Sequence, residues 1–268
     1  MSELLTNSRP KLETPSNREL LEGLLTIEGS TGETYRRFWN YSPRNMGFLA
    51  LQGCPPEPVA TYQRWSQLNR QVQKGSKAFS ILRPITVKVE SKNDDDEQKM
   101  IRRFKVVRAL FPLSQTEGEE LPPYEPEHWS VDRALGALAI ERVPFESYNG
   151  NIGGMAVGRT IAINPLAPNP LRTTLHEISH IEHGHTSPDQ LAQYQGHRGQ
   201  YEFEAEASAY VCLNELGELD DETASISRGY VKSWVRDQEP SEGSLRSVLN
   251  VSTKVLNAGR EQPKEEQE

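Results

Sequence analysis

Residues 175–180 read Leu-His-Glu-Ile-Ser-His, and this HExxH stretch decides how the rest of the chain is interpreted. If the stretch is helical, His176 and His180 lie one turn apart on one face, so both imidazoles can bind a single metal ion, with Glu177 beside them. A proline before the stretch suits a first helical turn, and a glycine after it suits a helix end. HExxH also occurs by chance, so the motif alone is weak evidence for a metal site. A third ligand elsewhere in the chain would strengthen the prediction.

A second helical segment, residues 201–210, supplies candidates for that ligand. It carries Glu202 and Glu206 one helical turn apart, and Glu202 follows His180 by 22 residues. We expect Glu202 as the third ligand and Glu206 behind a ligand histidine, where it would fix the tautomer; the two glutamates can also exchange these roles. Glu204 is expected to face solvent, and the alternative for all three glutamates is a solvated acidic face.

Three protein ligands predict one Zn²⁺ per chain, with a fourth position open to a water molecule whose pKa the ion lowers toward neutrality. Glu177 would then act as the general base, taking the proton of the attacking water and passing it to the leaving amine. A hydrogen-bond donor for the oxyanion is also needed, although each histidine among the candidates is equally expected to be a surface residue. The candidates for this donor are His183, His185, His197, Tyr210 and Tyr230.

Length and composition allow a real core and two domains in the 268 residues. The two cysteines, Cys54 and Cys212, are far apart and lack metal-ligand spacing, so no disulfide framework is predicted. The N-terminus lacks the pattern of a signal peptide, and no apolar run approaches the length that spans a membrane. We therefore expect a reduced, cytoplasmic protein without a membrane partner.

Charge is distributed unevenly along the chain, whose formal net charge is −8. Residues 35–110 contain 15 Lys and Arg against 6 Asp and Glu, a charge of +9, so the remainder carries −17. Four of these six acids lie together at residues 94–97. A basic segment within an acidic protein indicates a surface for a polyanion, and scattered solubilising charge is the alternative.

Aromatic and cationic side chains occur together in the first half of the chain, after a short amphipathic helix around residues 20–25. Rings can stack on nucleic-acid bases while cations pair with phosphates. Trp39, Phe48 and Trp65 are equally suited to the core of a small α+β domain. The residues expected to bind DNA are Tyr35, Arg36, Arg37, Trp65, Arg70, Lys74, Lys77, Arg102 and Arg103.

A basic β-hairpin is predicted in the same half. Residues 78–82 and 85–89 have strand patterns, and residues 104–111 form the expected partner strand beyond a polar, acidic loop at 91–98. Lysine and arginine side chains follow both strands. The proline-rich residues 113–127 then indicate a linker between domains.

The second half is predicted to contain helices and a short strand region. A helix at 131–142 is followed by a glycine-rich segment and by an alternating strand pattern at 159–164, directly upstream of the HExxH helix. If that strand lies at a sheet edge, it can pair with an extended peptide. Two further helices are expected at 225–236 and 241–258.

Together these patterns predict an α+β fold of two domains. The first would be a small α+β unit, and the second mostly helical with a small sheet. The expected order is a disordered leader at 1–15, a DNA-binding domain with the basic hairpin at 16–112, a linker at 113–127, a metal-binding domain at 128–260 and a charged tail at 261–268.

Four short motifs of the first half carry a family resemblance. They are Tyr35-Arg36 after Thr31-Gly32, Asn45 with Leu49-Ala50, Trp65, and Lys74-Gly75-Ser76-Lys77 before a strand. In these residues the chain resembles the N-terminal DNA-binding domain of the ArdC-type antirestriction proteins. The family more often has an acidic residue where Ser76 stands.

Three motifs of the second half resemble the metallopeptidase-like domain of the same family. They are the HExxH stretch, Glu202 with Ala205-Glu206, and Tyr230-Val231-Lys232-Ser233-Trp234. The resemblance implies a zincin-like fold, also similar to the ImmA/IrrE regulators, and an N-terminal domain that binds single-stranded DNA. It further implies protection of incoming DNA from host restriction. The expected partners are single-stranded DNA and a protein, either a substrate or a restriction enzyme.

Two alternative functions stay open at the level of sequence. One is a DNA-binding antirestriction protein whose metal is purely structural and supports no catalysis. The other is a regulatory peptidase, similar to ImmA/IrrE, that acts on a protein partner and does not bind DNA. Glu177 favours chemistry over a structural metal, because a structural site has no use for a general base.

Overall fold

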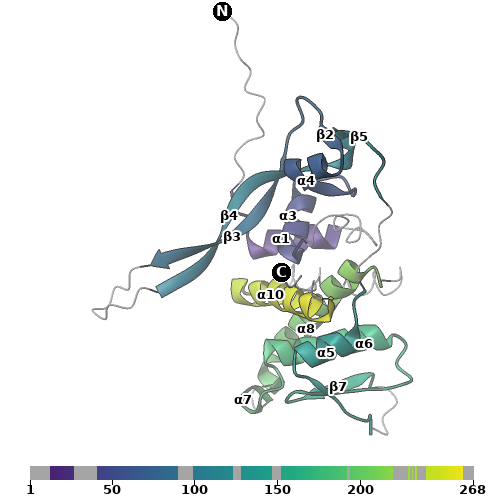
Figure 1. Cartoon of the computed structure of the whole chain (residues 1–268). Helices are drawn as coiled ribbons and strands as arrows, with labels where there is room; N and C mark the ends of the chain where they lie inside the picture. The colour runs from purple at the N-terminus through teal and green to yellow at the C-terminus, as the bar shows by residue number, and fades with distance from the viewer. Residues whose placement is uncertain are drawn as a thin grey trace, which may run out of the picture.

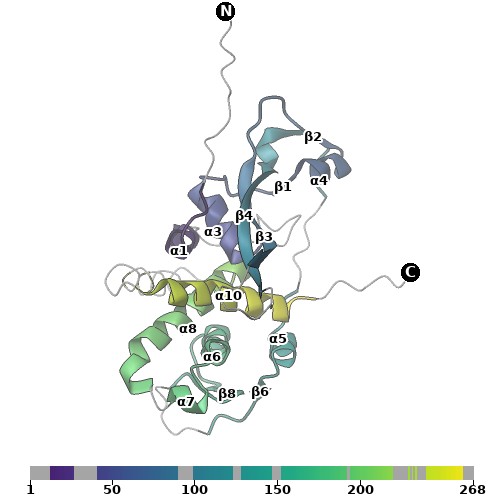
Figure 2. The same cartoon turned by 90° about the vertical axis from the view of Figure 1, so that its left-hand side faces the viewer.

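The chain has an α+β fold whose N-terminal and C-terminal elements form two layers of the molecule. Helix α10 (Glu242–Gly259) lies between these layers (Figures 1 and 2). A computed structural model describes residues 13–26, 41–89, 99–122, 128–146, 152–191, 194–219, 229, 231, 233 and 240–261. The predicted α+β class is confirmed.

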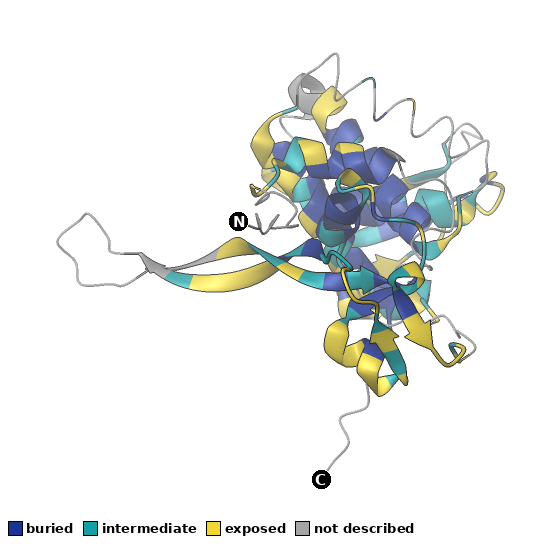
Figure 3. Ribbon diagram, turned by 90° about the horizontal axis from the view of Figure 1, so that it is seen from above, coloured by how far each residue is buried: buried dark blue, intermediate teal, exposed yellow. Residues whose placement is uncertain are grey.

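The N-terminal sheet has the order β1-β4-β3, with β1 at Val59–Thr61, β3 at Phe79–Val89 and β4 at Lys99–Pro112. Strands β3 and β4 pair antiparallel and extend beyond the body as an arm (Figure 3). The predicted hairpin is therefore confirmed, but its first strand is continuous through Pro84. Proline is tolerated there because β3 is an edge strand and needs no donor on its outer side.

Helices α1 (Asn17–Thr26) and α3 (Pro43–Leu51) cross with their backbones in contact. A Cβ atom at Gly47 would lie 2.2 Å from the backbone oxygen of Leu20, and one at Gly23 would lie 2.5 Å from the backbone oxygen of Gly47. Any side chain at Gly47 would therefore push the two helices apart. This contact positions the predicted amphipathic helix α1 against the rest of the N-terminal layer.

The first part of the predicted linker 113–127 is folded, which corrects that prediction. Residues Leu113–Gln115 form a 3-10 turn, and β5 (Thr116–Gly118) pairs antiparallel with β2 (Arg70–Val72). The Arg70 side chain donates hydrogen bonds to the Thr116 hydroxyl at 2.9 Å and to the carbonyl oxygens of Thr116 and Gly118. A proline-rich pattern does not reveal such side-chain contacts between strands distant in sequence.

The C-terminal layer contains a three-stranded sheet of order β6-β8-β7. Its strands and the preceding helix are α5 (Val131–Ala137), β6 (Glu141–Arg142), β7 (Gly154–Val157) and β8 (Thr160–Ile163). The predicted helix at 131–142 thus ends early, and the strand expected at 159–164 is central instead of an edge. Because β6 and β7 pair with the two sides of β8, these two strands are the edges of the described sheet.

In the described residues three more helices belong to this layer: α6 (Pro170–His183), α7 (Pro188–Leu191) and α8 (Tyr194–Leu216), and α10 packs against α6 and α8. The Asn169 side chain caps α6 by accepting from the Arg172 backbone N–H, and Gly184 ends it at φ 83°. The helix predicted at 225–236 falls mostly outside the described residues. No helix in the described part of the chain is both long enough and apolar enough to cross a bilayer.

One hydrophobic core joins the two layers. It includes Leu20 and Met46 of the N-terminal helices together with Phe203 of α8 and Val248 of α10. The buried Arg44 reinforces the junction, because its guanidinium donates to side-chain oxygens of Asn17 on α1 and Asn250 on α10 at 2.6 and 3.0 Å. The predicted domain boundaries stay a prediction, and the core shows that the two layers pack as one body.

Candidate metal centre

Two helices bring the three predicted ligands together. Helix α6 carries His176 and His180, and α8 carries Glu202. The Nε2 atoms of the two histidines lie 3.1 Å apart, and the Glu202 carboxylate oxygens lie 3.4 Å from Nε2 of His176 and 3.8 Å from Nε2 of His180. Zinc–nitrogen distances of about 2.0–2.1 Å give a tetrahedron with edges of about 3.3 Å, so the ligand atoms fit one tetrahedral ion.

Glu206 lies behind His176, in the supporting position predicted for it. Its Oε2 is 3.3 Å from Nδ1 of His176, and its Oε1 is 2.6 Å from the guanidinium of Arg172. Burial lowers the pKa of His176, but hydrogen bonds to Glu202 and Glu206 outweigh burial and raise this pKa to about 9. Without a metal, His176 is therefore a cation at neutral pH.

His180 has the opposite electrostatic environment. Burial and the neighbouring His176 cation lower the pKa of His180 to about 3. His180 is thus neutral at physiological pH, and its Nε2 lone pair faces Nε2 of His176. Without a metal ion, the pair of His176 and His180 therefore holds one more proton than it would with an ion bound.

Glu177 has the environment of a general base. Its side chain is buried, and burial raises its pKa to about 7, against the lowering effect of His176. The edge strand β7 passes directly beside it: a Cβ atom at Gly154 would lie 3.2 Å from Oε1 of Glu177 and 2.7 Å from Cγ2 of Thr173. The absence of a side chain at Gly154 leaves room for the carboxylate next to β7, which among the described strands pairs only with β8.

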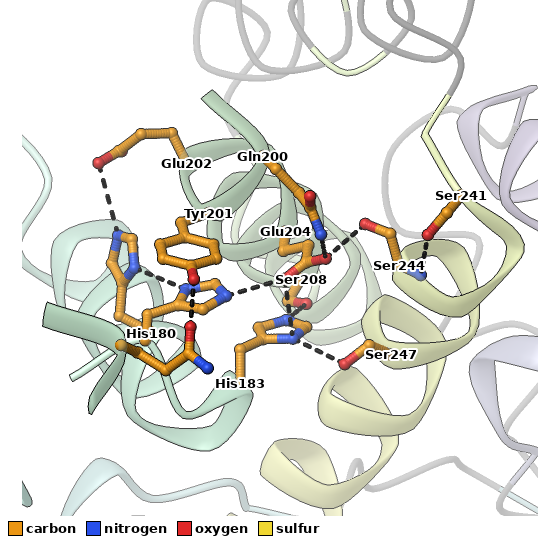
Figure 4. Close-up of polar contacts among 12 residues, drawn as sticks. His180, His183, Gln200, Tyr201, Glu202, Glu204, Ser208, Ser241, Ser244 and Ser247 are labelled. Atoms are coloured by element: carbon orange, nitrogen blue, oxygen red, sulfur yellow. Dashed lines mark hydrogen bonds and ion pairs between the residues drawn. The ribbon is translucent and has the colours of Figure 1, made fainter. Parts of the chain in front are cut away.

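A second polar cluster, which sequence reasoning missed, lies behind the ligands. His183, His185 and Glu204 place their nitrogen and oxygen atoms within 4.8 Å of one another. Glu204 was expected in solvent, but it is buried between α8 and α10 and accepts a hydrogen bond from Ser244 at 2.5 Å (Figure 4). Buried hydrogen bonds, first of all to His185, overcome the burial that raises its pKa and lower this pKa to about 2.

The side chains of the three oxyanion-donor candidates that the structure describes, His183, His185 and Tyr210, are all buried. His183 and His185 are enclosed, not surface residues, and His185 lies behind His180. Tyr210 is buried in the core shared by the two layers. The side chains of His197 and Tyr230 lie outside the described residues.

The predicted DNA-binding residues divide into four groups. Trp65 is fully buried on α4 (Tyr62–Gln67) and its indole N–H donates to the Phe111 carbonyl at 2.8 Å, so its assignment to base stacking is corrected to a core role. Arg70 holds β5. Lys74 and Arg103 are exposed, and Lys77 is half-buried. The remaining predicted residues, Tyr35, Arg36 and Arg37, lie outside the described part of the chain. The backbone of Arg102 is described on β4, but its side chain is not.

The register of the arm adds a cation that sequence reasoning did not single out. Arg83 of β3 lies directly opposite Lys105 of β4, and Arg103 is two residues along on the same face. All three are exposed. Like charges opposite one another destabilise a strand pair.

The chain was compared with known proteins and structures. Residues 26–110 match the family described as the N-terminal domain of anti-restriction factor ArdC. The crystal structure of the antirestriction ArdC protein from plasmid R388 in its metal-free form is similar with a TM-score of 0.52 and 18% identity, over 91% of this chain and 94% of that chain. Its Mn(II)-bound structure gives a TM-score of 0.50 and 17% identity, over 91% and 95%. Curated proteins gave no match. Residues 26–110 are therefore similar to this N-terminal domain family, and the chain shares its fold with the R388 ArdC structures along most of its length.

Proposed function

We propose that this protein is an ArdC-type antirestriction protein that binds single-stranded DNA through its N-terminal layer and has a metallopeptidase-type site in its C-terminal layer. The family match at residues 26–110 and the ArdC-like fold support the assignment to antirestriction. The geometry of the HExxH helix against Glu202 supports the metal site. This geometry is the observation that carries the proposal, because two imidazoles, a carboxylate and a buried base meet at one point.

His176, His180 and Glu202 hold the divalent ion in this proposal. The donor set of two nitrogens and one oxygen suits zinc, and the Mn(II)-bound structure of the R388 protein, which shares this fold, supports a divalent metal. A bound ion would polarise a peptide carbonyl and make a water molecule more acidic. Glu206 keeps the His176 ring in place through Nδ1, and Arg172 holds Glu206.

Glu177 is the proton carrier of the proposed reaction. With a pKa of about 7 it accepts a proton from the attacking water at neutral pH and releases that proton to the leaving amine. Among the described strands, β7 pairs only with β8, so an extended peptide can pair with its other side through main-chain hydrogen bonds. The peptide would then run past Gly154 with its carbonyl next to Glu177.

The arm of β3 and β4 is the proposed DNA-binding surface, together with the loop that carries Lys74 and Lys77. Arg83, Arg103 and Lys105 give the arm three cations on one face. Each phosphate that such cations neutralise releases condensed counterions. The slope of log affinity against log salt concentration should therefore be about −0.7 for each phosphate contacted on a single strand.

The test is a salt-titrated binding assay with single-stranded and double-stranded DNA of equal length. We expect tighter binding to the single strand, and the double variant Arg83→Ala/Lys105→Ala should reduce the salt slope by about 1.4 if each side chain contacts one phosphate. The matched control is Arg142→Ala/Arg198→Ala, which removes the same charge from exposed positions of the C-terminal layer. Equal slopes for both double variants, or no binding to single strands at low salt, would contradict the proposal.

A further inference from the structure

Behind His180 lies a chain of hydrogen bonds that ends on a buried carboxylate. Nδ1 of His180 is 3.0 Å from Nδ1 of His185, and Nε2 of His185 is 2.8 Å from Oε2 of Glu204. The other carboxylate oxygen of Glu204 accepts from the Ser244 hydroxyl and from the Gln200 amide, at 2.5 and 2.9 Å. All three residues of the chain are buried.

The orientation of the middle ring is fixed from both sides. The His185 imidazole stacks on the Tyr201 ring at 4.2 Å between centroids and on the His183 ring at 5.1 Å. His183 does not contact a ligand: its two nitrogens lie 2.8 Å from the Ser247 hydroxyl and 2.9 Å from the Ser208 hydroxyl. Figure 4 shows the His183 ring next to Ser247 of α10 and away from Glu202.

From these contacts we propose that His185 and Glu204 are positioning residues for the metal site, which hold His180 in its metal-binding tautomer through a directed relay. This inference rests on the proposed metal site at His176, His180 and Glu202. It adds to that site a buried anion two rings away from the ion. The support behind the other histidine ligand is shorter, because the Glu206 carboxylate contacts His176 directly.

The direction of the relay follows from proton counting. Binding through Nε2 leaves His180 with its single proton on Nδ1. That N–H donates to Nδ1 of His185, which must then be the acceptor, so the proton of His185 is on Nε2 and is donated to Glu204. Metal binding at Nε2 of His180 thus fixes the tautomer of both rings. The Glu204 carboxylate, acting through His185, makes Nε2 of His180 a more basic metal ligand.

The same atoms do not make a second metal site in this proposal. His183, His185 and Glu204 are close enough to hold an ion. However, both nitrogens of each histidine already have partners at hydrogen-bond distance, and one partner of His185 is a ligand of the first site. A second ion would have to displace these contacts and break the relay.

The experiment measures zinc affinity by chelator competition for the full-length wild-type protein and three variants. His185→Phe keeps the ring stack but removes both hydrogen bonds, and we expect zinc affinity to fall about 10- to 100-fold. His185→Gln can accept from His180 and donate to Glu204, and it should recover part of the loss. His183→Phe is the matched control: it keeps an aromatic ring stacked on His185 and removes only the polar contacts of His183 to Ser208, Ser247 and Glu204, so zinc affinity should be unchanged.

A second measurement keeps the proposal testable if His185→Phe fails to fold. Nitrogen-15 NMR of the zinc-loaded wild-type protein should show His180 protonated on Nδ1 and His185 protonated on Nε2. A His185 protonated on Nδ1, or equal zinc affinities for the two phenylalanine variants, would overturn the relay and leave the proposed function intact. Two zinc ions per wild-type chain, one of them lost in His183→Phe, would also overturn it. Wild-type protein that binds no zinc would overturn the metal site itself and the relay with it.

Discussion

Zinc binding should displace a proton from His176, and this makes affinity depend steeply on pH. The pKa of His176 is about 9, while a ligand must offer an unprotonated nitrogen. At pH 7 the two-unit difference leaves about one molecule in a hundred with neutral His176, a penalty of about 3 kcal/mol. Apparent affinity should therefore rise about tenfold per pH unit from pH 7 and level off near pH 9.

The assay is chelator competition across this pH range, combined with calorimetry in buffers of different ionisation enthalpy. We expect release of about one proton per zinc near pH 7.5 from His176. The raised pKa also stabilises the metal-free fold fully below pH 6.5, and this contribution should be lost as pH rises toward 9. Affinity that does not change with pH, together with no proton release, would refute the reasoning.

Glu206→Gln is the informative variant for this prediction. It removes one of the hydrogen bonds that raise the pKa of His176, so affinity should level off at a lower pH than in wild type. At pH 9, where proton competition has ended, the loss of support for the ligand should weaken binding about 10- to 100-fold. An unchanged levelling point would mean that Glu206 does not control the proton on His176.

Three further predictions concern the base, the helix crossing and the basic loop. Glu177→Gln should keep zinc and DNA binding but abolish peptide cleavage, and cleavage of a substrate at the wild-type rate would rule out its role as base. Gly47→Ala should lower the free energy of unfolding, measured in denaturant, by about 1–3 kcal/mol or more. Gly136→Ala, in an open helical position, should raise it by up to about 1 kcal/mol. Equal effects of the two variants would contradict the close backbone contact between α1 and α3. Lys74→Ala/Lys77→Ala should flatten the salt slope of single-strand binding, and an unchanged slope would exclude both lysines from phosphate contact.

Helical periodicity explains why the ligands could be predicted from the sequence. His176 and His180 share a face of α6 because they are four residues apart, and the same spacing places Glu202 and Glu206 on one face of α8. Packing of α6 against α8 then brings the two histidines and the two glutamates together. The predicted roles of the two glutamates agree with the observed distances, and assignment as metal ligands stays a prediction.

The proposed relay of His180, His185 and Glu204 could not be predicted, because residues 203–215 of α8 are buried on all faces of the helix and not on one face alone. Glu204 is two residues from Glu202 and therefore points away from the ligands, toward a face that reads as polar and exposed. That face is covered by α10, so residues from Phe203 to Glu215 are buried on every side of the helix. His185 also has no sequence signal, because it reaches His180 only after the chain turns at Gly184.

Aromatic composition likewise cannot separate stacking from packing. Trp65 lies among cations in the sequence, yet its indole is enclosed between α4 and β4. The edge strand was assigned to the wrong segment for a related reason: pairing partners such as β6 and β7 are too short to carry a pattern of their own.

The central claim is that one ion binds between α6 and α8, and anomalous diffraction at the zinc absorption edge from zinc-loaded crystals tests it most directly. We predict a single strong peak within bonding distance of Nε2 of His176, Nε2 of His180 and the Glu202 carboxylate. A peak among His183, His185 and Glu204 instead, or no peak at the HExxH helix, would contradict the account.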